Sequence, residues 1–254
     1  PKVTAAWTVV PAAHPRGAST RLRMAAGTGI RPPDAFEIAF TDNPGLAPER
    51  SVSVEAGIVQ TLAGGAVQAE ATIFHNRYDD LIISVGRLSG SSRYRTDNIA
   101  NARARGTEFS LAWRPRADLA ARSHYTWLDT AVLEVDGAAG QAAAPFAVGD
   151  RLLRRPTHQG GLDLAWTGRR FQAFAAATVR GATLDVEPNF GAFGGVFENR
   201  GYGILTVGGA WTVASRLTLQ ARVVNALGAR YEDVLGYPAL GRTAYAGLRV
   251  AAGR

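Results

Sequence analysis

Apolar and polar residues alternate along most of the chain. The stretch 51–61 shows the pattern clearly, because Val52, Val54, Ala56 and Ile58 are separated by serine, glutamate and glycine. A period of two residues predicts strands that are apolar on one face and polar on the other. Similar runs occur at 2–10, 20–27, 67–84, 105–113, 119–134, 152–167, 171–184, 201–213, 217–223 and 243–249. The pattern predicts about eleven strands, and long helical periodicity is missing.

The connections between these runs alternate in length. Short turns are expected near 63–66, 114–118, 168–170 and 214–216, and long loops near 30–50, 86–97, 135–150, 185–199 and 228–241. Outer-membrane β-barrels have such short periplasmic turns and longer extracellular loops, whereas a soluble β-sandwich has no reason to keep the alternation. We therefore predict an all-β fold, an antiparallel transmembrane β-barrel.

Three tryptophans, Trp113, Trp166 and Trp211, lie within about a turn of a short connection. This is where the aromatic girdle at the periplasmic interface of a barrel belongs. The alternative is that all three are core residues of a β-sandwich, and the sequence leaves both interpretations open.

The strand count bears on whether the barrel is complete. The last run follows a long loop, so it points toward the periplasm, and counting back gives the first run the same direction. Bacterial outer-membrane barrels have an even number of strands, and eleven is odd. We therefore expect residues 1–254 to be the C-terminal half, roughly strands 12 to 22, of a barrel of about 22 strands, a size that encloses a plugged lumen.

Composition excludes several other classes of protein. Of the 254 residues 46% are hydrophobic, but no run of about 18 apolar residues occurs, which excludes a transmembrane helix. The chain has no cysteine, and hence neither disulfides nor a cysteine-ligated metal. The net charge of +7 is attributed to scattered arginines on solvated or lumen-facing positions. The densest basic group, Arg151, Arg154 and Arg155, has no interleaved aromatic residues, so we expect no nucleic-acid partner.

Candidate catalytic and metal-binding patterns are missing from the sequence. None of the four histidines has metal-ligand spacing such as H-E-x-x-H. Asp79 and Asp80 offer two carboxylates to a cation, but without the pattern of an EF-hand loop. Neither a G-x-S-x-G nucleophile motif nor a phosphate-binding P-loop occurs. We therefore predict a protein that is not an enzyme and has no metal site and no cofactor.

The segment 223–249 carries a family resemblance. It reads N-A-L-G-A-R-Y-E at 225–232, G-Y-P at 236–238 and G-R-T-A-Y-A-G-L at 241–248, between two strand-like flanks. This wording resembles the last hairpin of TonB-dependent outer-membrane receptors. It is most similar to the vitamin B12 (cobalamin) receptors of that family.

Other segments resemble the same family in order and spacing. They read G-T-G-I-R-P-P at 27–33, N-P-G-L-A-P-E at 43–49, Y-D-D-L-I at 78–82, N-I-A-N-A-R-A-R-G-T-E at 98–108 and L-R-R-P-T-H at 153–158. Together they cover nearly the whole chain. Two features depart from the family pattern, since Ile30 stands where an aromatic residue is usual and the chain ends in V-A-A-G-R rather than in an aromatic residue.

The resemblance implies an outer-membrane receptor for the TonB-dependent uptake of a scarce ligand of the cobalamin or metal-chelate (siderophore) class. It implies a location in the cell outer membrane of a Gram-negative-type bacterium, with outer-membrane lipid and the TonB complex as partners. The N-terminal plug domain and the TonB-contacting segment are not in this sequence, so contact with TonB would involve a region missing from it. A passive porin-like channel and a truncated, non-transporting remnant remain as alternatives.

Several residues have expected structural roles. Pro33, Pro44 and Pro48 are expected to end strand pairing at the barrel rim, because proline has no backbone N–H to donate. Gly106 is expected to allow close backbone approach. Glu108 alternates with Thr107 and Phe109, so we expect it to face the lumen.

Ligand contacts, if this part of the chain makes them, are expected from the extracellular loops. Long loops are where a receptor captures a ligand, and aromatic and charged side chains are the residue types that would hold it. On position and residue type, the candidates are Arg31, Tyr94, Tyr202, Tyr231 and Tyr237.

Overall fold

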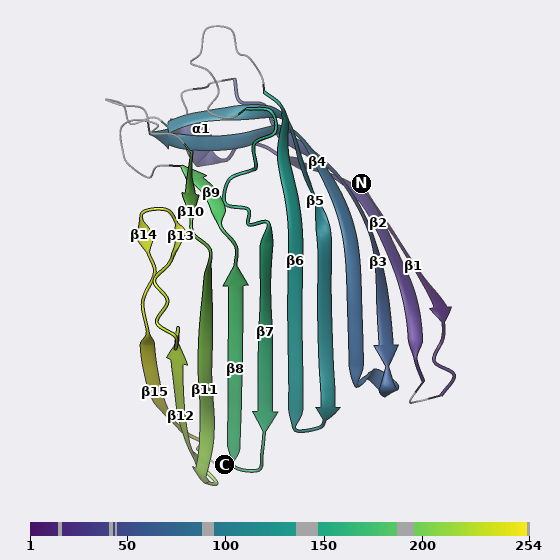
Figure 1. The fold of residues 1–254 in the computed structure, drawn as a ribbon, viewed down its shortest axis with the longest axis vertical. Helices are drawn as coiled ribbons and strands as arrows, with labels where there is room; N and C mark the ends of the chain where they lie inside the picture. Colours follow the sequence, from purple (N-terminus) through teal and green to yellow (C-terminus); the bar gives the residue numbers. More distant parts are fainter. Residues whose placement is uncertain are drawn as a thin grey trace.

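One curved antiparallel sheet makes up most of the molecule (Figure 1). The structure, a computed structural model, describes residues 1–14, 17–40, 43, 45–87, 94–135, 147–186 and 196–252. The sheet has eleven strands in the order β1-β2-β3-β4-β5-β6-β7-β8-β11-β12-β15, so each strand lies beside the one that precedes it in this sheet. The predicted all-β architecture of about eleven strands is confirmed, and the curvature is that of part of a barrel wall.

The strands of this sheet differ in length. They are β1 (Lys2–Val10), β2 (Ser19–Arg31), β3 (Glu49–Leu62), β4 (Val67–Arg87), β5 (Tyr94–Arg116), β6 (Leu119–Glu134), β7 (His158–Thr167), β8 (Phe171–Arg180), β11 (Tyr202–Ala214), β12 (Leu217–Val224) and β15 (Thr243–Val250). β4 and β5 have 21 and 23 residues. They far exceed the roughly 9–11 residues of a membrane-spanning strand.

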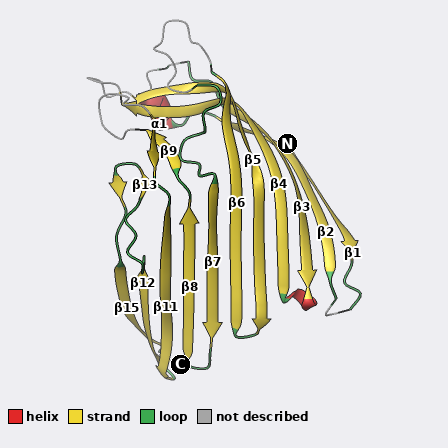
Figure 2. Ribbon diagram, viewed as in Figure 1, coloured by secondary structure: helices red, strands yellow, loops and turns green. Residues whose placement is uncertain are grey.

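The two ends of the sheet carry different connections (Figure 2). At the lower end in the figure, termed the turn end, strands are joined by short turns such as the 3₁₀ turn η1 (Ala63–Gly65). The upper end, termed the loop end, carries a helix and two small sheets. These are α1 (Ala35–Phe40), β9 (Thr183–Val186) paired with β10 (Val196–Asn199), and β13 (Glu232–Val234) paired with β14 (Tyr237–Pro238). The predicted alternation of short turns and long loops is confirmed.

The helix α1 lies inside a stretch that the sequence predicts as loop. Its first turn is held by reciprocal capping, since Asp34 Oδ1 accepts from the Glu37 backbone N–H at 2.7 Å and Glu37 Oε2 accepts from the Asp34 N–H at 2.7 Å. This pair is a capping box, a local signal for the start of a helix. Among the described residues, no helix has the length and apolar character needed to cross a membrane.

Two loops at the loop end are more ordered than the sequence predicts. β4 and β5 continue to pair as far as Arg87 and Tyr94, so the loop expected at 86–97 is shorter than predicted. The run expected at 171–184 divides, because β9 leaves the main sheet and pairs with β10 instead. In both places, backbone groups at the loop end form strand hydrogen bonds with another segment of the same loop. The Gly-rich tip at 191–195 lies outside the described residues.

The strand predicted at 152–167 begins only at His158. Arg154 has a positive φ of 57°, and Pro156 has no backbone N–H to donate to a neighbouring strand. This irregular segment instead places Leu152 in a small buried cluster. The cluster comprises Leu81, Ala102, Val132, Leu152 and Val186. The described core therefore lies at the loop end, where it can fix the loops in place.

Prolines mark the loop-side limits of two strands. β2 ends at Arg31, directly before Pro32 and Pro33, and β3 begins at Glu49, directly after Pro48. The expected role of Pro33 and Pro48 is thus confirmed. Pro44 lies outside the described residues.

Residue alternation gives the sheet one face rich in apolar side chains, termed the apolar face. Register aligns Ile58 of β3 with Ala71 of β4, and Ala71 with Phe109 of β5. Large apolar side chains on this face are well exposed, for example Met24 at 64% and Ile73 at 61%. A contiguous exposed surface of this kind needs an apolar medium or another protein to cover it.

The opposite face, termed the polar face, carries charged side chains. Arg23 of β2 forms an ion pair with Glu70 of β4, and Arg122 lies opposite Asp163 in register. Glu108 alternates with Thr107 and Phe109 of the other face, and therefore belongs to the polar face. This is the side on which the sequence places the lumen.

Trp113, Trp166 and Trp211 lie on the apolar face close to the turn end. Their exposed fractions are 47%, 39% and 43%, so the alternative that they form a sandwich core is wrong. The indole N–H of Trp166 donates to Asp118 Oδ2 in the turn before β6 at 3.1 Å. An apolar ring with its polar group turned toward the chain end is typical of a membrane-interface tryptophan.

Gly106 lies where β5, β4 and β6 approach closely. A Cβ atom there would lie 2.1 Å from the Trp127 carbonyl oxygen and 2.9 Å from the Phe74 ring, so the predicted close approach is confirmed. We expect Gly106→Ala to destabilise the protein by about 2 kcal/mol, because the backbone must move to relieve the overlap. Gly203→Ala is the control, since its Cβ would meet its nearest neighbour only at 3.7 Å. Equal denaturant midpoints for the two variants would contradict the expectation.

Candidate ligand-binding site

Two tyrosines and an ion pair meet at the loop end of the wall. Tyr202 is the first residue of β11 and Tyr231 directly precedes β13, and their ring centroids lie 4.1 Å apart with an interplanar angle of 31°. Arg180, the last residue of β8, donates from Nη1 to Asp233 Oδ1 at 2.7 Å. The Tyr202 hydroxyl donates to the same oxygen. The four residues, termed the tyrosine cluster, thus join the wall to the loop between β12 and β15.

Register explains why Tyr202 and Arg180 lie together. They are direct cross-strand partners, and Arg180 is also the partner of Gln159. Gln159, Arg180 and Tyr202 share the polar face, so the tyrosine cluster sits at the loop-side edge of that face. A ligand arriving from the loop end toward the polar face would meet it.

The buried carboxylate of Asp185 holds the surrounding loops together. Its side chain is fully buried; Oδ1 accepts from Arg154 Nε at 2.8 Å and from the Val186 N–H at 2.9 Å. Oδ2 accepts from the Leu235 N–H at 2.9 Å. One carboxylate therefore fastens β9, the segment before β7 and the loop that carries Tyr231.

A second set of side-chain contacts shapes the loop of Tyr231. Asn225, fully buried with a φ of 52°, accepts from the Ala229 N–H at 2.9 Å and donates to the Ala229 carbonyl oxygen at 2.8 Å. Asn199 of β10 donates to the Glu232 carbonyl oxygen at 3.0 Å. Asparagine tolerates this left-handed conformation because its short side chain can bond to the nearby backbone. The chain is thus held by side-chain hydrogen bonds shortly before Tyr231, at Ala229, and directly after it, at Glu232.

Arg31 lies at the loop end of β2, in a separate ion-pair network. Its guanidinium donates to Glu49 Oε2 at 3.0 Å and to Glu37 Oε2 at 3.1 Å. Partial burial acts to lower the pKa of Arg31, but hydrogen bonds and charge from Glu49 and Glu37 outweigh it, so the pKa is raised above its ordinary value. Arg31 therefore anchors α1 to β3 and contacts none of the tyrosine cluster among the described contacts.

The other two candidates have different surroundings. Tyr94 was expected in a loop, but it is the first residue of β5 and pairs with Arg87, because the β4–β5 ladder extends past the wall. Tyr237 lies in β14 opposite Val234 and is 58% exposed. Among the side chains that the structure describes, Tyr202 and Tyr231 are the two predicted residues that it brings together.

Sequence analysis missed Arg180, Asp233 and Asp185. Arg180 gave no signal as a site residue, since it lies inside the alternating run predicted at 171–184 rather than at its end. Asp233 and Asp185 had none, because their partners are distant in sequence. The arrangement offers aromatic faces, a hydroxyl and a guanidinium to a ligand with polar and ring-shaped groups. In the described ranges, no group of three or more His, Asp or Glu is placed to hold a metal ion.

A curved antiparallel wall with one apolar face, short turns at one end and long loops at the other defines a β-barrel class. A family profile described as "TonB dependent receptor-like, beta-barrel" matches residues 1–226. The chain therefore belongs to the TonB-dependent receptor β-barrel family, and the predicted resemblance is confirmed at this level. No curated protein sequence matches the chain.

Solved structures share the fold at low sequence identity. The ferric-catecholate import receptor Fiu from E. coli K12 aligns with 98% of this chain and 34% of its own, at 16% identity and a TM-score of 0.71. For the ferric enterobactin receptor PfeA from Pseudomonas aeruginosa (G324V mutant), the alignment covers 98% of this chain and 40% of PfeA, at 18% identity and a TM-score of 0.66. The copper transporter OprC aligns with 97% and 39%, at 17% identity and a TM-score of 0.67.

The chain thus spans between about a third and two fifths of the length of these structures. At such identities the similarity establishes the fold alone. None of the three is described as a cobalamin receptor, so the resemblance to that branch of the family gains no support from them.

Proposed function

We propose that this chain is part of the barrel of an outer-membrane receptor that takes up a scarce metal chelate of the siderophore class in a TonB-dependent manner. The observation that carries the proposal is the division of the wall: one face apolar, one polar, short turns at one end and a cluster of fixed loops at the other. Lipid would cover the apolar face and the polar face would line the lumen. The similar fold of two ferric-siderophore receptors and a copper transporter supports this ligand class over cobalamin.

The edges of the sheet support the proposal that residues 1–254 are part of a larger barrel. β1 and β15 each have one neighbour in the described sheet. Because they are the first and last of eleven consecutive antiparallel strands, the two edge strands run in the same direction. Direct pairing of β1 with β15 would be parallel, whereas bacterial outer-membrane barrels are antiparallel throughout. A further odd number of strands would allow antiparallel closure, and we place these eleven in the C-terminal half of a barrel of about 22 strands.

The proposed partners follow from this placement. Outer-membrane lipid would contact the apolar face, and the extracellular medium would supply the ligand at the loop end. TonB would act through a plug and an N-terminal segment, which are not in this sequence. The mass of the native protein in the outer-membrane fraction tests the assignment: a chain several times larger than 26.8 kDa supports it, and a stable species of 26.8 kDa contradicts it.

The tyrosine cluster is the proposed point of ligand contact in this part of the barrel, together with the exposed Tyr237. We expect Tyr231→Ala to weaken ligand binding about tenfold, since loss of one well-packed aromatic contact costs on the order of 1–2 kcal/mol. The measurement is equilibrium binding of ferric enterobactin and of copper to the full-length receptor. Leu227→Ala, a 70% exposed position in the same loop, is the control.

A passive porin-like channel is the main competing function. It would conduct ions steadily in planar bilayers and would bind neither probe above background. A receptor closed by a plug would show little steady conductance and saturable binding. Saturable binding that is unchanged in Tyr231→Ala would leave the receptor proposal standing and would remove the tyrosine cluster from it.

A further inference from the structure

Three arginines and a histidine gather on the apolar face where it approaches the loop end. His75 and Arg77 of β4 lie on the same face as Ile73, because they follow it at intervals of two residues. Arg103 and Arg105 of β5 share that face through their pairing with β4. These four residues are termed the basic cluster.

Register places like charges opposite one another in the basic cluster. His75 pairs with Arg105, and Arg77 pairs with Arg103. Like charges directly opposite on neighbouring strands are destabilising. A cross-strand arrangement of this kind is stabilised when an anion lies between the cations.

The nearby carboxylates do not fully satisfy these cations. Asp129 is shared, since its Oδ2 lies 2.8 Å from Arg105 Nε and 3.2 Å from Arg103 Nη2. Asp79 lies 3.4 Å from Arg77 Nε. Arg77 also donates from Nη2 to Asn101 Oδ1 at 3.3 Å, and Asn101 in turn donates to Glu134. Two carboxylates and one amide oxygen therefore face three guanidinium groups. In the described part of the chain, the Nε atom of Arg103 is buried without a hydrogen-bond partner.

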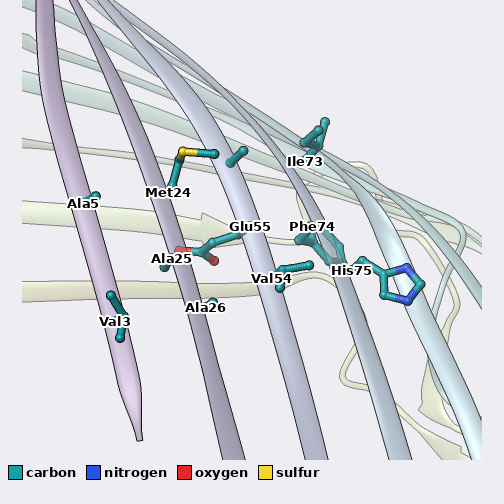
Figure 3. Close-up of a pocket in the computed structure, with 11 residues that line it drawn as sticks. Val3, Ala5, Met24, Ala25, Ala26, Val54, Glu55, Ile73, Phe74 and His75 are labelled. Carbon is teal, nitrogen blue, oxygen red and sulfur yellow. The ribbon is translucent and has the colours of Figure 1, made fainter.

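An apolar hollow lies on the same wall, and His75 of the basic cluster is at its edge (Figure 3). Its volume is about 440 Å³, and its lining comes from β1, β2, β3 and β4. Small residues such as Ala26 and Ala56 are flanked by the larger Met24 and Ile73. His75 also lines the hollow, so the apolar hollow and the basic cluster are continuous.

We infer that this surface binds one anionic lipid, with a phosphate group on the basic cluster and an acyl chain in the hollow. The inference rests on the proposed function, because it requires the apolar face to lie in a membrane. The height of the basic cluster along the wall agrees with a lipid head group at this position. Arg105 lies eight residues along β5 from Trp113, which is about 27 Å of strand at roughly 3.4 Å per residue. With a strand tilt of about 40°, the height is about 20 Å, near the edge of an apolar band of about 25 Å.

The chemistry of the two halves selects a lipid over a free anion. Guanidinium groups bind phosphate oxygens in a charge-assisted manner, which accounts for the basic cluster. A free phosphate would leave the apolar hollow unused. A neutral lipid would fill the hollow but would leave the arginines with only the shared Asp129 and Asp79 as anionic partners.

The test measures lipid binding to the full-length protein in neutral detergent by native mass spectrometry. The probes are phosphatidic acid, phosphatidylcholine and inorganic phosphate. The first variant combines Arg77→Gln, Arg103→Gln and Arg105→Gln. Its matched control removes three polar-face charges through Arg122→Gln, Arg222→Gln and Arg249→Gln. The second variant, Ala56→Leu, fills the hollow without touching a charge.

We expect the first variant to bind phosphatidic acid on the order of a hundredfold more weakly than wild type, since each arginine near an anionic lipid contributes about fivefold. The control should bind like wild type, and Ala56→Leu should weaken the binding of phosphatidic acid. Equal binding by the first variant and its control, or competition by inorganic phosphate at the affinity of the lipid, would overturn the inference. Heat-modifiable migration of each variant first establishes that it forms a barrel; wild type without that behaviour would refute the proposed function itself.

Discussion

Phe109→Arg is expected to destabilise the membrane-inserted protein by about 2–4 kcal/mol, the cost of an arginine at the lipid-facing midplane of a barrel. Phe109 lies midway along β5 between Trp113 and Arg105, on the apolar face, and its side chain is 50% exposed. In the proposed lipid environment, a guanidinium there would have neither water nor a carboxylate partner. The charge would force local thinning of the bilayer or partial withdrawal of the strand.

Ser110→Arg and Phe109→Leu are the matched controls. Ser110 is the next residue along β5 and belongs to the polar face, opposite His124 in register, so an arginine there meets a polar lumen. Phe109→Leu removes the ring without adding charge and should cost about 1 kcal/mol. Urea unfolding of full-length protein in lipid vesicles measures all three. Similar midpoints for Phe109→Arg and Ser110→Arg would mean that this face does not contact lipid.

Asp185→Ala is expected to release the loop that carries Tyr231, at a cost of about 3 kcal/mol. The substitution leaves the Val186 and Leu235 N–H groups and the Arg154 guanidinium without their acceptor. Each buried donor without a partner costs about 1–3 kcal/mol, and Arg154 contributes less because half of its side chain reaches solvent. The wall itself should keep its strands, since Asp185 lies in β9, outside the main sheet.

Hydrogen exchange of the Leu235 amide is the direct measurement. It should become at least tenfold faster in Asp185→Ala, while amides of β5 stay protected. Glu198→Ala is the control, because Glu198 belongs to the same small β9–β10 sheet but its side chain is exposed. Its ion pair with Arg151 is long at 4.0 Å. Asp185→Asn keeps one acceptor oxygen, so its Leu235 exchange rate should fall between those of Asp185→Ala and Glu198→Ala. Unchanged exchange in Asp185→Ala would show that other contacts, such as that of Asn199, hold the loop.

The wall and the loops of this protein depend on different features of the sequence. In the wall, period-two alternation alone places Phe109 and Ser110 on opposite faces. In the loops, a single buried carboxylate joins three segments. If Asp185→Ala still inserts into the membrane but binds ferric enterobactin less well, loop order is needed for ligand binding and not for formation of the barrel.

The sequence determined the wall of this protein. Alternation, turn lengths and the three tryptophans near the turns are local or periodic signals, and each strand pairs with its neighbour in order, so local pattern and global fold agree. Gly106, Pro33 and Pro48 behaved as predicted, and Glu108 lies on the polar face, because these features follow from residue type and position within a strand. The family followed from motifs spread over both the wall strands and the loops that join them.

Only the tertiary structure decided the loop end. The helix α1 lies in a stretch predicted as loop, and its anchoring by Arg31 and Glu49 joins residues from separate elements. Tyr202 and Tyr231 meet because Asp185, Asn225 and Asn199 fix their loop through contacts between residues as far as 50 positions apart. Irregular loops satisfy their backbone groups with side chains distant in the chain rather than with a repeating ladder. Their pairing therefore has no periodic trace in the sequence.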